Sequence, residues 1–201
     1  MNKLDKISKI LSLVLAVLFW ALLIRGLLYG FFSARSCIAL LMDPAKDTTV
    51  TVNGITQNFL SIYSETGITI TNRTLLIENL LSLIVSFLQT PVLCYAIHLL
   101  RKILAPIAQQ RPFSGTASLL IKLGWTSIAI AVIRNVFDYG LVYQYEHGMN
   151  ISRMFEGSLI TEVHFHYEPD YTFVLLAVVV FILAAVFRHG EQLQQLSDET
   201  L

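Results

Sequence analysis

The chain has 201 residues, of which 55% are hydrophobic and only 14% are charged, and its mean hydropathy is +0.64. An ordinary soluble domain carries about 25% charged residues, so this composition excludes a typical water-soluble protein and indicates an integral membrane protein. The formal net charge is zero, which argues against direct binding of nucleic acid.

Four apolar runs follow one another along the chain. A bilayer core about 30 Å thick needs roughly 20 helical residues to cross it, and each run is long enough to do so. We therefore predict one all-α transmembrane domain, a four-helix membrane bundle. The predicted spans are residues 10–32, 75–100, 119–143 and 171–187.

The loops at 33–74 and 144–170 contain alternating sequences typical of strands. In the first loop, β-branched residues flank Asn53-Gly54, the dipeptide that favours a two-residue hairpin turn. GITIT at 67–71 and SLITEVHFHY at 158–167 alternate as well. We predict a hairpin at Asn53-Gly54 and a small β-rich extracytoplasmic cap formed by both loops.

The remaining connections are short and polar. Pro106 and Pro112 interrupt the linker at 101–118, and Ser114 suits the N-cap of the third span. The tail at 188–201 is rich in Gln and Glu, which predicts one or two turns of helix beyond the bilayer.

Basic residues gather at one end of the predicted spans. Loops on the cytoplasmic side keep an excess of Lys and Arg. The outer loops hold only Arg35, Lys46, Arg73 and Arg153. The opposite side carries Lys3, Lys6, Lys9, Arg101, Lys102, Arg111 and Arg188. We therefore expect both termini to be cytoplasmic.

Several short motifs resemble a known family. They are Pro112-Phe113-Ser114, an apolar run with Lys122 and Gly124-Trp125, and a tail with Phe187, Gly190, Leu193, Asp198, Thr200 and Leu201. Together they resemble the bacterial membrane family named domain of unknown function 2975. The chain departs from that family at Leu196, where the tail usually carries an acidic residue. The resemblance brings no established activity. It implies a bacterial inner membrane as the location and a cytoplasmic helix-turn-helix regulator as partner, because members are bacterial and commonly encoded beside one.

Charged residues lie within the predicted spans. Arg25 and Arg134 are each roughly 22 Å from the inner end of their spans at a rise of about 1.5 Å per residue. Asp138 follows Arg134 at the spacing that lets helical side chains meet, and Glu78 lies near the outer end of the second span. Such charges usually face the bundle interior and pair. We predict one outer layer of two cations and two anions.

A polar stripe on the second span extends this layer, because its members fall on one helical face. We favour a structural network that fixes helix register and anchors the cap, since no polar residues continue through the inner halves of spans one and four. The alternative is a proton or ion path, or a polar ligand pocket. The predicted network is Arg25, Glu78, Asn79, Ser82, Ser86, Gln89, Arg134, Asn135 and Asp138.

EVHFHYE at 162–168 is a candidate metal site. In a strand, Glu162, His164, His166 and Glu168 would share one face. Imidazoles and carboxylates bind zinc or copper, and imidazoles outside the membrane can also sense pH. We favour an amphipathic strand with a solvated polar face over a metal site.

The sequence contains no nucleophile elbow, phosphate-binding loop or paired catalytic motif, so we expect neither an enzyme nor a cofactor. The leading hypothesis is a membrane sensor or regulatory partner of a cytoplasmic protein. Its expected docking surface is Pro112, Phe113, Ser114, Phe187, Gly190, Leu193, Asp198 and Thr200. The alternative is a small transporter or channel subunit that uses Arg25, Glu78, Arg134 and Asp138.

Overall fold

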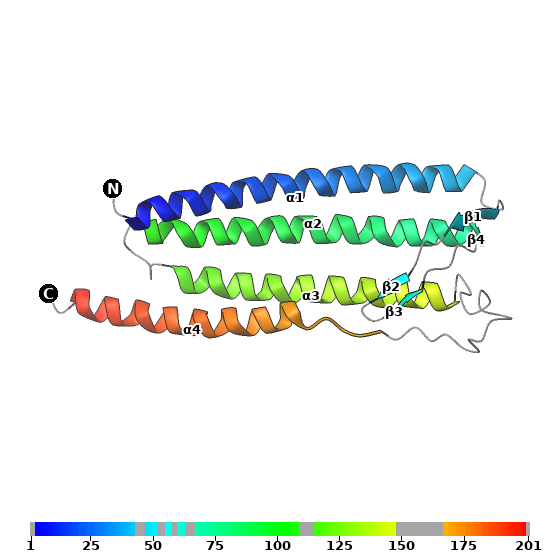
Figure 1. The fold of residues 1–201 in the computed structure, drawn as a ribbon. Coiled ribbons are helices and arrows are strands. Elements are labelled where there is room, and N and C mark those ends of the chain that lie inside the picture. The colour runs from blue at the N-terminus through cyan, green and yellow to red at the C-terminus, as the bar shows by residue number, and fades with distance from the viewer. Residues whose placement is uncertain are drawn as a thin grey trace. The chain divides into compact units, whose positions relative to one another are not determined.

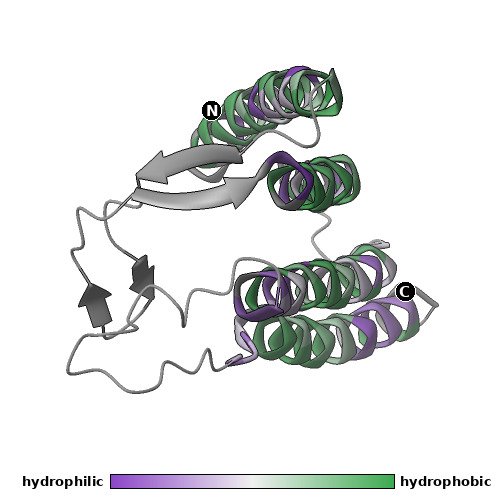
Figure 2. Cartoon of the chain, turned by 90° about the vertical axis from the view of Figure 1, so that its right-hand side faces the viewer, coloured by the Kyte–Doolittle hydropathy of each residue, from purple (hydrophilic) through white to green (hydrophobic). Residues whose placement is uncertain are grey.

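The computed structural model describes residues 3–42, 47–51, 55–57, 60–62, 67–108, 115–147 and 167–199. Most of these residues belong to four long helices, α1 (Lys3–Met42), α2 (Asn72–Ala108), α3 (Thr116–His147) and α4 (Thr172–Glu199) (Figure 1). Each helix contains a stretch long and apolar enough to cross a membrane. Figure 2 shows hydrophobic residues along most of every helix and hydrophilic ones over the last turns of α4. The prediction of four apolar, membrane-length helices is confirmed.

All four helices extend beyond the predicted spans. α1 continues to Met42, although the sequence predicts a loop from residue 33, and Pro106 lies in the last turn of α2 instead of ending the helix. The predicted boundaries were wrong because they follow hydropathy. Residues 33–37 contain neither Gly nor Pro, so the backbone can stay helical after the sequence becomes less apolar. The tail is helical as predicted, but α4 continues to Glu199, about three turns past residue 187 where one or two were predicted.

Four short strands lie between α1 and α2. β1 (Asp47–Thr51) pairs antiparallel with β4 (Gly67–Thr71), and β2 (Ile55–Gln57) pairs with β3 (Leu60–Ile62). The predicted hairpin would pair β1 with β2 across Asn53-Gly54; that turn lies outside the described residues, and β1 is paired with β4 instead. β4 leads directly into α2, and the register sets Asp47 opposite Thr71. The first strand of the loop therefore pairs with the last one, although the local sequence favours pairing with the next.

A β-rich cap drawn from both outer loops is not supported. All the described strands come from the first loop. Residues 148–166, which hold most of the second alternating run, lie outside the described residues, and Tyr167 at the end of that run is in no helix or strand. The strand predicted at GITIT is present as β4.

The chain divides into two compact units. The first contains Met1–Leu28, Ser86–Asn135 and Pro169–Leu201, and the second contains Tyr29–Val85 and Val136–Glu168. The core of the first unit joins three helices: Leu99 of α2, Leu120 and Leu123 of α3, and Val180 and Ala184 of α4. Ala96, Ile103, Leu119 and Phe187 pack against it.

Glycines allow close helix contacts in the first unit. A Cβ atom on Gly124 would come within 2.5 Å of the Phe181 ring, and one on Gly26 would come within 2.5 Å of the Thr90 side chain. Small residues are favoured at such contacts because helices in lipid associate mainly through packing and hydrogen bonds. Gly124 therefore sets how closely α3 and α4 approach, and Gly26 does the same for α1 and α2.

Candidate functional site

The site begins where α4 begins. The Asp170 carboxylate accepts a hydrogen bond from the backbone N–H of Thr172 at 2.8 Å, and the carbonyl of Tyr171 accepts one from the N–H of Leu175 at 2.9 Å. The first N–H groups of a helix lack intrahelical partners, and an Asp before them satisfies one. Asp170 therefore caps the first turn of α4 from the position before Tyr171, whose carbonyl accepts the first helical hydrogen bond.

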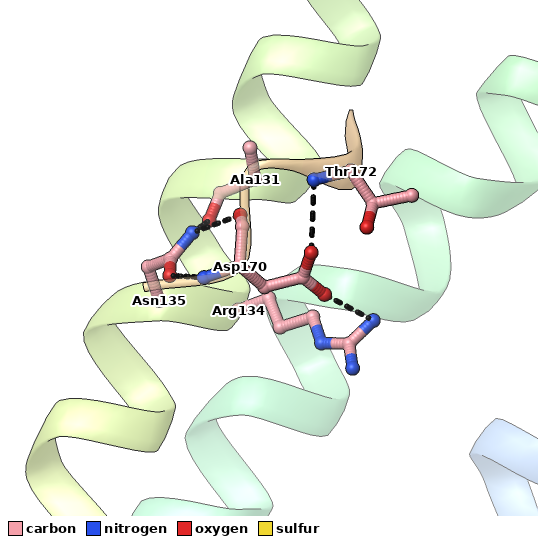
Figure 3. A network of polar contacts seen from close by, with 5 residues as sticks. All are labelled: Ala131, Arg134, Asn135, Asp170 and Thr172. Atoms are coloured by element: carbon pink, nitrogen blue, oxygen red, sulfur yellow. Dashed lines mark hydrogen bonds and ion pairs between the residues drawn. The ribbon is translucent and has the colours of Figure 1, made fainter. Parts of the chain in front are cut away.

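Asn135 of α3 holds the backbone of this cap (Figure 3). Its Oδ1 accepts a hydrogen bond from the N–H of Asp170 at 2.7 Å, and its Nδ2 donates to the carbonyl of Asp170 at 3.0 Å. Nδ2 also donates to the carbonyl of Ala131, one turn earlier in α3, at 2.8 Å. A side-chain amide presents a donor and an acceptor together, as this two-point contact requires. Asn135 thus fastens the start of α4 to α3.

Arg134 completes the arrangement. Its Nη1 lies 3.1 Å from Oδ2 of Asp170, with 47% of the arginine and 25% of the aspartate side chain exposed. Hydrogen bonds from Thr172 hold the pKa of Asp170 below its usual value, and the Arg134 guanidinium adds a smaller effect in the same direction. We call Arg134, Asn135, Asp170 and Thr172 the polar lock.

The polar lock lies far along α3 from the start of that helix. From Thr116 to Arg134 the helix rises roughly 27 Å at about 1.5 Å per residue. A hydrocarbon core is about 30 Å thick, and α4 begins at the lock. In a membrane of that thickness the lock would therefore lie near one boundary of the hydrocarbon core. The residues of the polar lock bind one another, so the lock joins α3 to the start of α4.

The contacts of the described residues test only part of the predicted charged layer. The ion pair that the structure shows for Arg134 goes to Asp170, which the sequence analysis left in the outer loop. Arg25 is exposed on α1 in the first unit, whereas Glu78 and Asp138 are half-buried in the second unit. The four-charge layer stays a prediction. Asp170 was missed, although an Asp just before an apolar helical run is a recognised start signal.

The predicted stripe on α2 is half-buried at Asn79, Ser82, Ser86 and Gln89. Nδ2 of Asn79 donates to the carbonyl of Leu75 in its own helix at 2.9 Å. Sequence reasoning also missed two buried hydroxyls of α3. Thr126 and Ser127 donate to the carbonyls of Lys122 and Leu123 at 2.7 and 3.0 Å.

The candidate metal site falls mostly on residues that the structure does not describe. Glu162, His164 and His166 lie outside the described residues, and Glu168 is exposed. In the described ranges, no group of three or more His, Cys, Asp or Glu side chains is placed to hold a metal ion. The metal site stays a prediction.

Only some residues of the expected docking surface are described. Pro112, Phe113, Ser114 and Thr200 lie outside the described residues. Ser114 was the predicted N-cap of the third span; the described chain resumes at Gly115, with φ of 70°, and α3 follows at once. Phe187 packs against the core of the first unit and Gly190 is half-buried, whereas Leu193 is 54% exposed and Asp198 lies in the last turn of α4.

Comparisons with protein-family models, with curated proteins and with solved structures find no match to this chain. The length and composition of its four helices are those of a multi-pass membrane protein. Any narrower function must be argued from the polar lock and the helices that it joins.

Proposed function

We propose that this chain is a non-enzymatic membrane sensor or regulatory partner in which α4 transmits a change at the polar lock to the polar turns at its far end. The observation that carries the proposal is that two adjacent residues of α3 bind Asp170, which caps α4. Asp170 also closely follows the outer segment 148–166. A signal that pulls on this segment would therefore act first on the lock and then on α4.

The polar groups favour a sensor over a carrier. Transport and proton paths usually contain charged side chains inside the membrane. Among the described residues, the buried polar side chains are serines, threonines and one asparagine, without a charged residue. Thr126 and Ser127 of this set bind carbonyls of their own helix. These contacts stabilise α3 and direct both hydroxyl protons to its own backbone.

The proposed orientation follows from the charges. Basic residues at the N-terminus, in the linker between α2 and α3 and after Phe187 favour cytoplasmic termini in a bacterial inner membrane. The last turns of α4 would then extend into the cytoplasm, where Leu193 is exposed. The resemblance to domain of unknown function 2975 adds a helix-turn-helix regulator as the proposed partner.

Photocrosslinking in native membranes tests this proposal. A crosslinking residue is placed at Gln192 or Gln195, both exposed on α4, in otherwise wild-type chain and in Asn135→Ala. We expect a cytoplasmic DNA-binding protein to be captured, with a yield that changes at least about twofold when the lock is broken. Asn79→Ala serves as control, because among the described residues Asn79 bonds within its own helix turn. Capture of no cytoplasmic protein, or equal yields with and without the lock, would contradict the proposal.

Flux in proteoliposomes separates this proposal from the transporter hypothesis. A sensor should leave vesicles as tight as protein-free ones to protons and small ions. Flux that is present in the wild-type protein and lost in Asp138→Asn would instead support a carrier, because Asp138 belongs to the predicted charged layer.

A further inference from the structure

A shallow, open groove lies between α2 and α3, away from the polar lock. It lies wholly within the first unit and has a volume of about 490 Å³. Ligand pockets commonly measure about 300 to 1,000 Å³, so the groove has room for part of a small amphipathic molecule. Its walls include Pro91 and Tyr95 of α2 and Lys122, Trp125 and Ala129 of α3.

The groove is polar at one end and apolar at the other. Leu99 packs with Leu120 and Leu123, while Tyr95 shares the groove with Trp125, so α2 and α3 run antiparallel here. Lys122 and Tyr95 therefore lie toward the end where α2 and α3 connect. Pro91 and Ala129 lie toward the other end, Ala129 roughly 10 Å beyond Lys122 at about 1.5 Å per residue.

Thr126 also lines the groove but adds little polarity. Its hydroxyl donates to the carbonyl of Lys122 at 2.7 Å, which leaves mainly its methyl group for a ligand. Among the described residues that line the groove, none is acidic. The ammonium of Lys122 is thus the one full charge among them, and it is positive.

Phe181 supports the aromatic wall of the groove. Because Gly124 has no side chain, Phe181 of α4 reaches α3 and packs edge-to-face on Trp125, with ring centroids 5.8 Å apart and planes at 69°. Trp125 is nevertheless 63% exposed. The indole is therefore supported on one side and open on the other, as a preformed binding wall requires.

We propose that this groove binds an anionic phospholipid, with the phosphate at Lys122 and Tyr95 and an acyl chain along Pro91 and Ala129. A lysine near the end of a span directs its ammonium to the headgroup region, and basic pockets between membrane helices attract anionic headgroups. Lys102 is exposed two turns after Tyr95 on the same face of α2 and adds a second cation at the polar end. The inference goes beyond the proposed sensor role and does not depend on it.

Tryptophan fluorescence tests the inference, because the chain has only two tryptophans. Trp20→Phe leaves Trp125 as the sole reporter. The protein is reconstituted with brominated lipids, which quench tryptophan on contact, either anionic phosphatidylglycerol or zwitterionic phosphatidylcholine. We expect the anionic lipid to bind at Trp125 about fivefold more strongly, the effect of about 1 kcal/mol for one basic side chain. Lys122→Gln should bring the ratio close to one, and Lys122→Arg should keep most of it.

The second tryptophan supplies a matched control. Trp125→Phe leaves Trp20, which is 60% exposed on α1 and should report no more than the general lipid shell, with or without Lys122→Gln. Tyr95→Phe should lower the preference at Trp125 partly, and it provides a second variant should Lys122→Gln fold poorly. Equal binding of the two lipids at Trp125, or a preference that survives both Lys122→Gln and Tyr95→Phe, would overturn the inference.

Discussion

α1 and α3 are both apolar helices of membrane length, yet they are packed very differently. In the most apolar stretch of α3 half of the residues are buried, against 6% in that of α1, although α1 is the more hydrophobic of the two. The buried positions of α3 include Gly124, Thr126, Ser127 and Ala131, whereas α1 exposes large side chains such as Leu27. In lipid, hydropathy marks the residues that can face acyl chains, while small and hydrogen-bonding residues mark the packed face.

The largest loss of stability is expected when a side chain is added to the packed face of α3. Gly124→Leu sets a side chain where even a Cβ atom would meet Phe181 at 2.5 Å. Overpacking of this kind costs about 1 to 3 kcal/mol. Ala21→Leu adds a larger side chain to an exposed position of α1 and should be nearly neutral. Unfolding in mixed micelles by increasing sodium dodecyl sulfate measures both variants.

A second substitution tests whether the clash is the cause. Phe181→Ala removes the ring that Gly124→Leu would strike, so the double variant should recover part of the loss. If Gly124→Leu is as harmless as Ala21→Leu, the contrast between the packed helix and the exposed helix fails.

The next largest effect should come from the polar lock. Asn135→Ala removes two hydrogen bonds to the backbone of Asp170, and should destabilise the protein by about 1 to 2 kcal/mol. Asn79→Ala is a matched control, because both amides donate to the carbonyl four residues earlier, and of the two only Asn135 binds a second segment within the described part of the chain. Equal losses in the two variants would mean that the lock contributes nothing beyond its own helix.

The sequence predicted the helices well because their signal is local. Twenty apolar residues identify a span wherever it packs, but the ends of the spans and the pairing of β1 with β4 depend on contacts between distant residues. The same limit explains the outcome at Asn53-Gly54, where a strong local turn signal did not decide which strands pair.

The site was predictable in part for the same reason. Arg134 and Asn135 were identified because polar residues in an apolar run are conspicuous. Their partner Asp170 is separated from them by the whole second outer loop, and in the sequence it resembles the other acidic residues of that loop. Only its position next to the fourth span, where an Asp suits a helix start, distinguished it.

A smaller effect is expected from the charged contact of the lock. Arg134→Gln should destabilise the protein less than Asn135→Ala, because the guanidinium is 47% exposed and exposed ion pairs contribute little. Its effect should shrink further at high salt, which screens exposed charges. A double-mutant cycle with Asp170→Asn measures the coupling between the two side chains. Coupling larger than the loss in Asn135→Ala would show that charge, and not the amide, holds the segments together.

The smallest expected effect is the change of folding stability with pH. This change shows which contact holds the Asp170 carboxylate. Its pKa is lowered in the folded protein, so its contribution is complete at neutral pH and is lost as the pH falls below the ordinary value of 3.8 and through the lower folded value. Unfolding of wild type and Asp170→Asn, compared from pH 6 down to about pH 2, should therefore differ by less at the acid end. The hydrogen bond from the Thr172 hydroxyl lowers the pKa of Asp170 more than Arg134 does, and Thr172→Val removes that hydroxyl while it keeps the backbone N–H. Thr172→Val should therefore flatten this difference more than Arg134→Gln. A larger flattening in Arg134→Gln than in Thr172→Val would show that Arg134 holds the carboxylate. The contact between α3 and Asp170 would then be mainly a salt bridge.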